Sequence, residues 1–108
     1  SQGYLNNAID ILNKALASGH RNASVLVLLG IANGELGFDN KAFYYFNEAL
    51  RLDAKSEEAM LNMGIFYANH NQLNKAIEIW QEGLNKNPNS TIIKENIDRA
   101  KELLWKRR

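Results

Sequence analysis

The stretch NKAFYYFNEAL, residues 40–50, returns later as NKAIEIWQEGL, residues 74–84, and occurs earlier as NNAIDILNKAL, residues 6–16, so that each copy begins 34 positions after the preceding one. The three copies share small and large apolar side chains at the same places. The matched positions are Ala8, Ala42 and Ala76, then Leu12, Phe46 and Trp80, then Ala15, Ala49 and Gly83, then Leu16, Leu50 and Leu84. Their spacing of three and four places them on one face of an α-helix. A fixed period of this length predicts an array of similar units.

The segments that precede residues 40–50 and 74–84 also match each other in this register. The correspondences are Leu26 with Met60, Leu29 with Met63, and Gly30 with Gly64. Each unit is therefore predicted to contain two amphipathic helices. The chain is expected to turn between them at Gly37 in one unit and at Asn71 in the next, because both residue types tolerate a positive φ. The candidate helix N-caps are Asn22, Ser56 and Asn89 or Ser90. Pro88 marks the break before the last helix.

These features predict an all-α fold of six antiparallel helices without strands. The expected helices cover residues 4–17, 23–36, 40–52, 57–69, 73–86 and 90–105. Gly30 and Gly64 lie inside expected helices, where glycine costs about 1 kcal/mol relative to alanine. We therefore expect a neighbouring helix to approach each glycine closely, through the alanines aligned above. Phe46 and Trp80 are expected to fill the space between successive hairpins.

The 34-residue helix-turn-helix unit resembles the tetratricopeptide repeat. The family's signature positions hold, in one unit, Leu26, Leu29, Gly30, Asn33, Ala42, Phe46, Ala49 and Ala54, and in the next Met60, Met63, Gly64, Tyr67, Ala76, Trp80, Gly83 and Pro88. Asn33, Gly83 and Ala54 depart mildly from the usual aromatic residue, alanine and proline.

The resemblance extends over a single domain of residues 1–108. Within it, residues 4–22 hold the second helix of an incomplete repeat, 23–56 and 57–90 are repeats, and 91–108 form a capping helix. It implies a right-handed superhelical solenoid whose concave face holds a peptide or a partner's helix, and it implies no catalysis.

Composition narrows the possible functions. The chain has no cysteine, which excludes disulfide frameworks, thiolate nucleophiles and zinc ribbons. The net charge of +1 gives no general attraction for nucleic acid, and no nucleic-acid partner is expected. The longest apolar run, residues 25–29, is far shorter than the roughly 20 residues that span a bilayer, so no membrane insertion is expected. The compartment remains open.

No group of residues indicates an active site. His20 and His70 are far apart in the chain, and neither has a serine or carboxylate at a spacing typical of a catalytic triad or a metal pair. Surface histidines are the simpler interpretation of both. We therefore expect a protein that is not an enzyme, with no catalytic residue, metal or cofactor.

The helix expected at residues 23–36 predicts an apolar binding surface. Its first half is apolar on all sides, which is more than packing inside one repeat requires. The residues predicted to contact a partner are Val27, Leu28, Ile31, Leu61, Asn62, Ile65, Leu5 and Ile9. An exposed apolar strip is typical of a protein-interaction site. The alternative is that the first helix and local packing cover this strip.

The resemblance also bears on the type of partner. Many members of the family grip a C-terminal carboxylate with a clamp of Lys, Asn and Arg side chains. The corresponding positions here are Val27, Ile31, Asn62, Ile92 and Asn96. Asn62 alone fits the clamp, so we do not expect this groove to hold an acidic C-terminal tail.

The first helix lacks a hairpin partner in the expected arrangement. Its apolar residues cannot all be covered by one neighbouring helix: Leu5, Ile9, Leu12 and Leu16. A repeat array normally ends in a polar cap, so either the chain was cut from a longer array or another subunit covers this helix.

The leading functional prediction is a scaffold, adaptor or assembly factor that binds an apolar or helical segment of a protein partner. The alternatives are a self-assembling structural subunit that forms homo-oligomers, and an accessory interaction domain of a larger protein.

Overall fold

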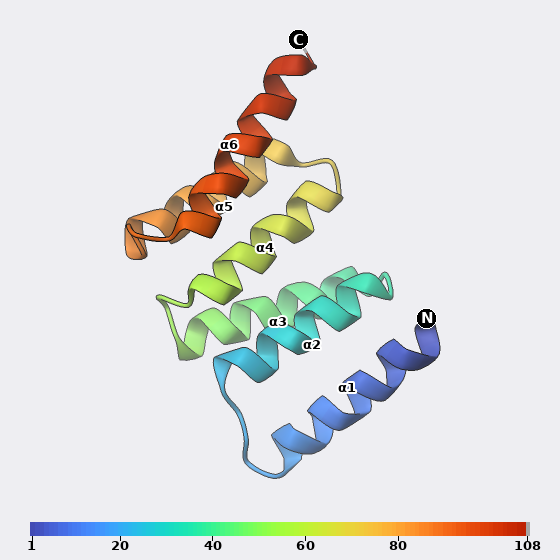
Figure 1. Ribbon diagram of the computed structural model, residues 1–108. Helices are drawn as coiled ribbons and strands as arrows, with labels where there is room; N and C mark the ends of the chain where they lie inside the picture. The colour runs from blue at the N-terminus through green and yellow to red at the C-terminus, as the bar shows by residue number, and fades with distance from the viewer. Residues whose placement is uncertain (108) are drawn as a thin grey trace.

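The computed structural model describes residues 1–107, and this part of the chain contains six α-helices and no strand (Figure 1). The helices are α1 (Gln2–Ala17), α2 (Ala23–Glu35), α3 (Asp39–Leu52), α4 (Glu57–Asn69), α5 (Leu73–Lys86) and α6 (Thr91–Lys106). Every helix begins and ends within two residues of the range expected from the sequence. The predicted all-α class is therefore confirmed. Arg108, the last residue of the expected capping segment, lies outside the described residues.

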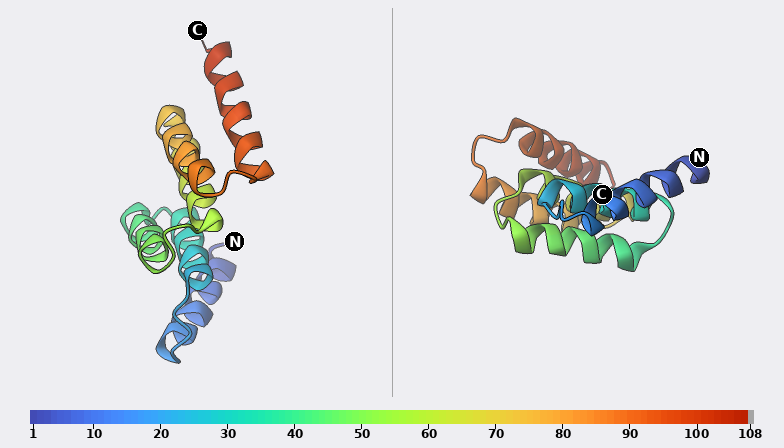
Figure 2. Two further views of the ribbon diagram at one scale, coloured as in Figure 1. Left: turned by 90° about the vertical axis from the view of Figure 1, so that its left-hand side faces the viewer. Right: turned by 90° about the horizontal axis from the view of Figure 1, so that it is seen from below.

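The helices pack in the order in which they follow one another along the chain. α2 pairs with α3 and α4 pairs with α5, and these two pairs have the most extensive contacts. α1 packs on α2, α6 packs on α5, and α4 contacts both α2 and α3. Figure 2 shows the resulting elongated shape, with α1 and α6 at opposite ends. Its principal extents are 46 × 29 × 20 Å.

Local sequence signals explain where the helices begin and turn. The side chains of Asn22, Ser56 and Ser90 each accept a hydrogen bond from the backbone N–H three residues later, at 3.0, 3.0 and 3.2 Å. These bonds satisfy N–H groups that have no partner inside the helix. Gly37 and Asn71 have φ angles of 86° and 66°, as expected for the turns inside the two hairpins. The predicted N-caps and turns are therefore confirmed.

The buried side chains form two clusters. The first joins α2, α3 and α4 through Leu26, Val27, Ala42, Phe46, Ala49, Ala59, Met63 and Phe66. The second joins α5 and α6 through Leu73, Ala76, Trp80, Ile93, Ile97 and Ala100. α1 contributes no buried residue to either cluster. It is held to α2 only by half-buried side chains.

The two helical glycines mark close contacts, but the contacting residues differ from the expectation. A Cβ atom at Gly30 would lie 2.7 Å from the ring of Phe46, and one at Gly64 would lie 2.0 Å from Nε1 of Trp80. Trp80 Nε1 also donates a hydrogen bond to the carbonyl oxygen of Leu61 at 3.1 Å. The aromatic rings, and not the aligned alanines, therefore lie over the glycines. Each ring enters its own hairpin, because the absence of a side chain on the glycine leaves room for it there. The rings also reach the next helix, as expected: Phe46 lies 6.3 Å from Phe66 of α4 between ring centroids, and Trp80 belongs to the buried cluster of α5 and α6.

An ion-pair cluster joins the loop between α1 and α2 to α3. Arg21 Nη2 lies 3.3 Å from Glu48 Oε1, while the Nε of Arg51 donates to the other carboxylate oxygen. The hydrogen bond from Arg51 lowers the pKa of Glu48, and the charges of Arg51 and Arg21 lower it further against partial desolvation. The cluster lies at the surface, so its effect on stability is small and sensitive to salt.

Candidate interaction surfaces

An apolar groove runs between α1 and α2, and we call it the N-terminal groove. Its α1 wall is formed by Tyr4, Leu5, Ala8, Ile11 and Leu12, and its α2 wall by Leu28, Ile31, Ala32 and Glu35. The groove has a volume of about 390 Å³. Among the described residues that line it, Glu35 is the only charged one. Such a lining suits an apolar ligand with one positive charge.

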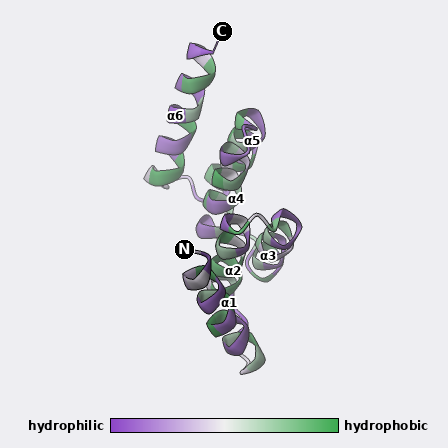
Figure 3. Cartoon of the chain, turned by 90° about the vertical axis from the view of Figure 1, so that its right-hand side faces the viewer, coloured by the Kyte–Doolittle hydropathy of each residue, from purple (hydrophilic) through white to green (hydrophobic). Residues whose placement is uncertain are grey.

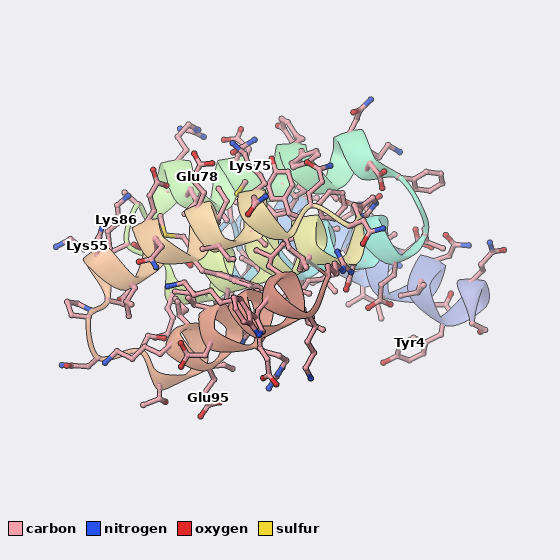
Figure 4. The ribbon with its side chains drawn as sticks, turned by 90° about the horizontal axis from the view of Figure 1, so that it is seen from above. Tyr4, Lys55, Lys75, Glu78, Lys86 and Glu95 are labelled. Carbon is pink, nitrogen blue, oxygen red and sulfur yellow. The ribbon has the colours of Figure 1, made fainter. Side chains whose placement is uncertain are left out.

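Three large side chains of the N-terminal groove are exposed to solvent. Tyr4 is 75% exposed, Ile11 is 66% exposed and Leu28 is 47% exposed. Figure 4 shows the Tyr4 side chain extending away from the other helices. One exposed apolar residue is normal on a protein surface, whereas several at one groove mark an interaction site.

The exposure follows from the sequence of α1, which has two apolar faces. The first face is half-buried and contains Leu5, Ile9, Leu12 and Leu16. The second, offset by one residue, contains Tyr4, Ala8, Ile11 and Ala15. Figure 3 shows hydrophilic and hydrophobic residues alternating along this helix. Because α2 is the main neighbour of α1, the second face is covered only in part: Ala8 and Ala15 are half-buried, whereas Tyr4 and Ile11 are exposed.

A second pocket lies between α2 and α4, and we call it the central pocket. It has a volume of about 260 Å³. It is lined by Gly30, Ile31, Gly34, Glu35, Phe46, Asn62, Ile65, Phe66, Asn69 and His70. Ile31 and Glu35 line both this pocket and the N-terminal groove. α2 is therefore a wall shared by the two surfaces.

Polar side chains at the rim of the central pocket are held by bonds within the chain. The His70 ring stacks on Phe66 with 4.2 Å between ring centroids, and its Nδ1 lies 2.8 Å from the Phe66 carbonyl oxygen. A carbonyl oxygen can only accept, so Nδ1 carries a proton. The Nε2 atom lies 3.2 Å from the Asp39 carboxylate. Asn62 donates through Nδ2 to the carbonyl oxygen of Glu58 at 2.8 Å.

The residues predicted to contact a partner fall into four groups. Those that line the N-terminal groove are Leu5, Leu28 and Ile31. Those that line the central pocket are Ile31, Asn62 and Ile65. Two others are half-buried and line neither, Ile9 and Leu61. Val27 is 0% exposed, in the core cluster of α2, α3 and α4, and so cannot itself contact a partner.

Sequence reasoning missed Tyr4, Ile11 and Glu35 as parts of a surface. The signal that could have identified the first two is the spacing of the second apolar face of α1, which repeats at four and three residues. Glu35 could not be recognised from spacing, because its importance comes from the apolar residues that surround it in space.

Within residues 1–107, no three Asp, Glu or His side chains come together in a way that suits a metal ion. In the same range, no helix combines the length and the apolar character required to cross a membrane. Every buried side-chain nitrogen or oxygen described has a hydrogen-bond partner. The N-terminal groove, with its three exposed apolar side chains, is the feature that most suggests a function.

Comparison with known proteins adds no further constraint. The chain matches no protein-family model, and no curated protein is significantly similar to it. The surfaces of the molecule are therefore the evidence for its function.

Proposed function

We propose that the chain is a tetratricopeptide-like solenoid that binds an apolar segment of a partner protein through the N-terminal groove. In this proposal it acts as a non-catalytic scaffold, adaptor or assembly factor. The 34-residue repeat, the consecutive packing of helix pairs and the contact of an aromatic ring with a helical glycine support the family resemblance. The observation that carries the function is the gathering of Tyr4, Ile11 and Leu28 at one groove.

The apolar side chains of this groove are less stable in water than they would be under a partner. Burying apolar surface contributes about 25 cal/mol per Å², and a large side chain that becomes fully buried contributes about 1.5–3 kcal/mol. A partner that covers Tyr4, Ile11 and Leu28 together would gain this contribution at three adjacent positions. Part of the gain is offset by the entropy lost on association.

The two ends of the helix array differ in how their exposed apolar residues are arranged, which favours the N-terminal end as the docking site. On α6, Lys94, Asp98 and Lys101 are exposed. The residues 34 positions earlier on α4 are Met60, Gly64 and Tyr67, two of which are buried. A polar outer face of this kind is typical of a terminal cap in helical-repeat proteins. α6 also has exposed apolar side chains, those of Ile92, Leu103 and Trp105. At the N-terminal end, by contrast, Tyr4, Ile11 and Leu28 all line one groove.

A selection of peptides displayed against the purified chain tests the proposal. Ile11→Lys and Leu28→Lys should each weaken the binding of selected peptides by at least about tenfold, which corresponds to roughly 1.4 kcal/mol. Ile92→Lys is the matched control, because Ile92 is 44% exposed on α6, far from the groove. Circular dichroism should show the same helix content in all three variants. Selected peptides that bind both groove variants as tightly as the natural chain would show that the proposal is wrong.

Self-assembly is the second candidate function. The observation that favours it is the spacing of Tyr4, Ala8, Ile11 and Ala15, which repeats as in a coiled-coil seam and would fit the same face of a second copy. Sedimentation velocity over a wide concentration range separates the two functions. A concentration-dependent dimer that Ile11→Lys abolishes would favour self-assembly, whereas a monomer that binds peptides favours a separate partner.

A further inference from the structure

The two walls of the N-terminal groove, α1 and α2, correspond to α3 and α4 in the 34-residue repeat. The packing against α3 and α4 therefore shows which kind of helix would fit the groove. On its α1 wall, Ala8 and Leu12 correspond by the repeat to Ala42 and Phe46 of α3. On its α2 wall, Ile31 and Ala32 correspond in the same register to Ile65 and Phe66 of α4. In the complete repeat, α3 and α4 both contact α2. The N-terminal groove therefore corresponds to the place that α2 fills one repeat later.

The way α2 fits this place shows what the groove requires. A Cβ atom at Gly30 would lie 2.7 Å from the Phe46 ring, so this position accepts no side chain. A Cβ atom at Gly34 would lie 3.6 Å from Ala42 Cβ and 3.4 Å from the Phe66 ring, which leaves room for no more than a methyl group. Two small residues four positions apart thus allow α2 to approach both walls.

The same template shows where charge matters. The residue 34 positions after Glu35 is Asn69, which lines the central pocket together with Glu35 itself. A helix that copied α2 in the N-terminal groove would therefore place its own glutamate near Glu35. Neither α2 nor α4 contains a lysine or arginine that could neutralise such a pair, and Asp10 and Lys14 of α1 do not line the groove. A basic residue at that position would instead form an ion pair with Glu35.

We infer that the N-terminal groove holds an α-helix of a partner protein, antiparallel to α1 as α2 is to α3. One Gly or Ala of this helix lies on Leu12 and a second, four residues later, lies on Ala8. A Lys or Arg directly follows the second small residue and forms an ion pair with Glu35, which is the charged residue among the described residues that line the groove. This inference rests on the proposed function and specifies the class of partner.

A peptide with the sequence of residues 22–36 provides the probe, in its natural form and with Glu35→Lys. The lysine peptide should bind the full chain about fivefold more tightly than the natural peptide, because an attraction replaces a repulsion at the surface. In the chain variant Glu35→Lys this preference should reverse. A third peptide combines Glu35→Lys with Gly30→Leu and Gly34→Leu, and it should bind at least about tenfold more weakly than the Glu35→Lys peptide. Leucine favours helix more than glycine does, so this loss reports bulk and not helix formation.

Each outcome decides one part of the inference. Equal binding of the natural and lysine peptides would overturn the pairing with Glu35, and undiminished binding of the leucine peptide would overturn the helix packing. A dimer that Ile11→Lys abolishes, without peptide binding, would assign the groove to a second copy and overturn the inference. If display-selected peptides depend on Ile11 and Leu28 while every α2 peptide fails, the inference is wrong and the proposed function stands.

Discussion

Replacement of Gly64 by alanine tests the contact between α4 and α5 most directly. The added Cβ atom would lie 2.0 Å from Nε1 of Trp80 and 2.4 and 2.5 Å from two ring carbons. Nonbonded carbon atoms are normally about 3.5–4 Å apart, so the indole ring must move by more than about 1 Å. Because Trp80 Nε1 donates a hydrogen bond to the carbonyl oxygen of Leu61 at 3.1 Å, the movement also disrupts this bond.

The magnitude follows from three contributions to the free energy of unfolding. Overpacking of a close-packed core costs about 1–3 kcal/mol, and loss of the indole hydrogen bond costs about 1 kcal/mol. Alanine offsets about 1 kcal/mol of this, because it favours helix more than glycine does. We therefore predict that Gly64→Ala destabilises the chain by about 2 kcal/mol. For a domain of this size, that change lowers the melting temperature by about 8–16 °C.

The matched control is Gly34→Ala in α2, the equivalent helix of the preceding hairpin. Its Cβ atom would lie 3.4 Å from the ring of Phe66 and 3.6 Å from Ala42, which are ordinary contact distances. The helix propensity of alanine should therefore dominate and stabilise this variant by about 0.5–1 kcal/mol. Urea unfolding followed by circular dichroism measures both changes. If Gly64→Ala were as stable as the natural chain, or if both variants changed in the same direction, the close-contact argument would be refuted.

Three further predictions follow from the same structure. Phe46→Ala should cost about 3–5 kcal/mol, and a thermal melt close to that of the natural chain would contradict its central place in the core. For Glu48→Gln, the lowered pKa of Glu48 means that the charged form stabilises the fold above its ordinary pKa of 4.5. The natural chain should melt at a slightly higher temperature than Glu48→Gln at neutral pH. This difference should disappear as the pH falls below 4.5 and through the lowered pKa of Glu48. A difference that persists in acid would exclude the ion pair as its cause. Ile11→Gln combined with Ile31→Gln, two residues that line the N-terminal groove, should abolish partner binding or self-association without loss of helical circular dichroism, and unchanged binding would count against the groove.

The fold could be predicted closely because local and repeated signals agreed. Asn22, Ser56 and Ser90 each precede a helix and cap it, while Gly37 and Asn71 supply the positive φ of the two turns. The 34-residue period then placed equivalent helices in equivalent surroundings. The side-chain contacts within each hairpin could not be predicted in the same way. The repeat shows that Gly30 and Phe46 occupy recurring positions, but it does not show that their atoms are in contact.

The candidate surfaces were predicted only in part. Leu28 and Ile31 were identified because α2 has more apolar residues than one hairpin needs. Val27 lies on the same helix and appeared equivalent, but it is buried against the next repeat. A rotation of about 100° per residue separates an exposed from a buried position on a helix. The sequence alone does not fix this rotation when a helix is apolar on every side.

The apolar character of α2 connects the fold with the proposed function. A helix that is apolar all round is normally buried all round. Leu26 and Leu29 are fully buried, yet Leu28 on the same helix is 47% exposed and Ile31 is only half-buried. The described part of the chain thus covers some of the apolar faces of α2 and leaves the one that forms the N-terminal groove. Because Ile31 also lines the central pocket, a partner helix in the groove would bear on the wall of that pocket. The two surfaces share α2. If a ligand in the groove changes the affinity of the central pocket for a second ligand, the second ligand changes the affinity of the groove for the first by the same factor.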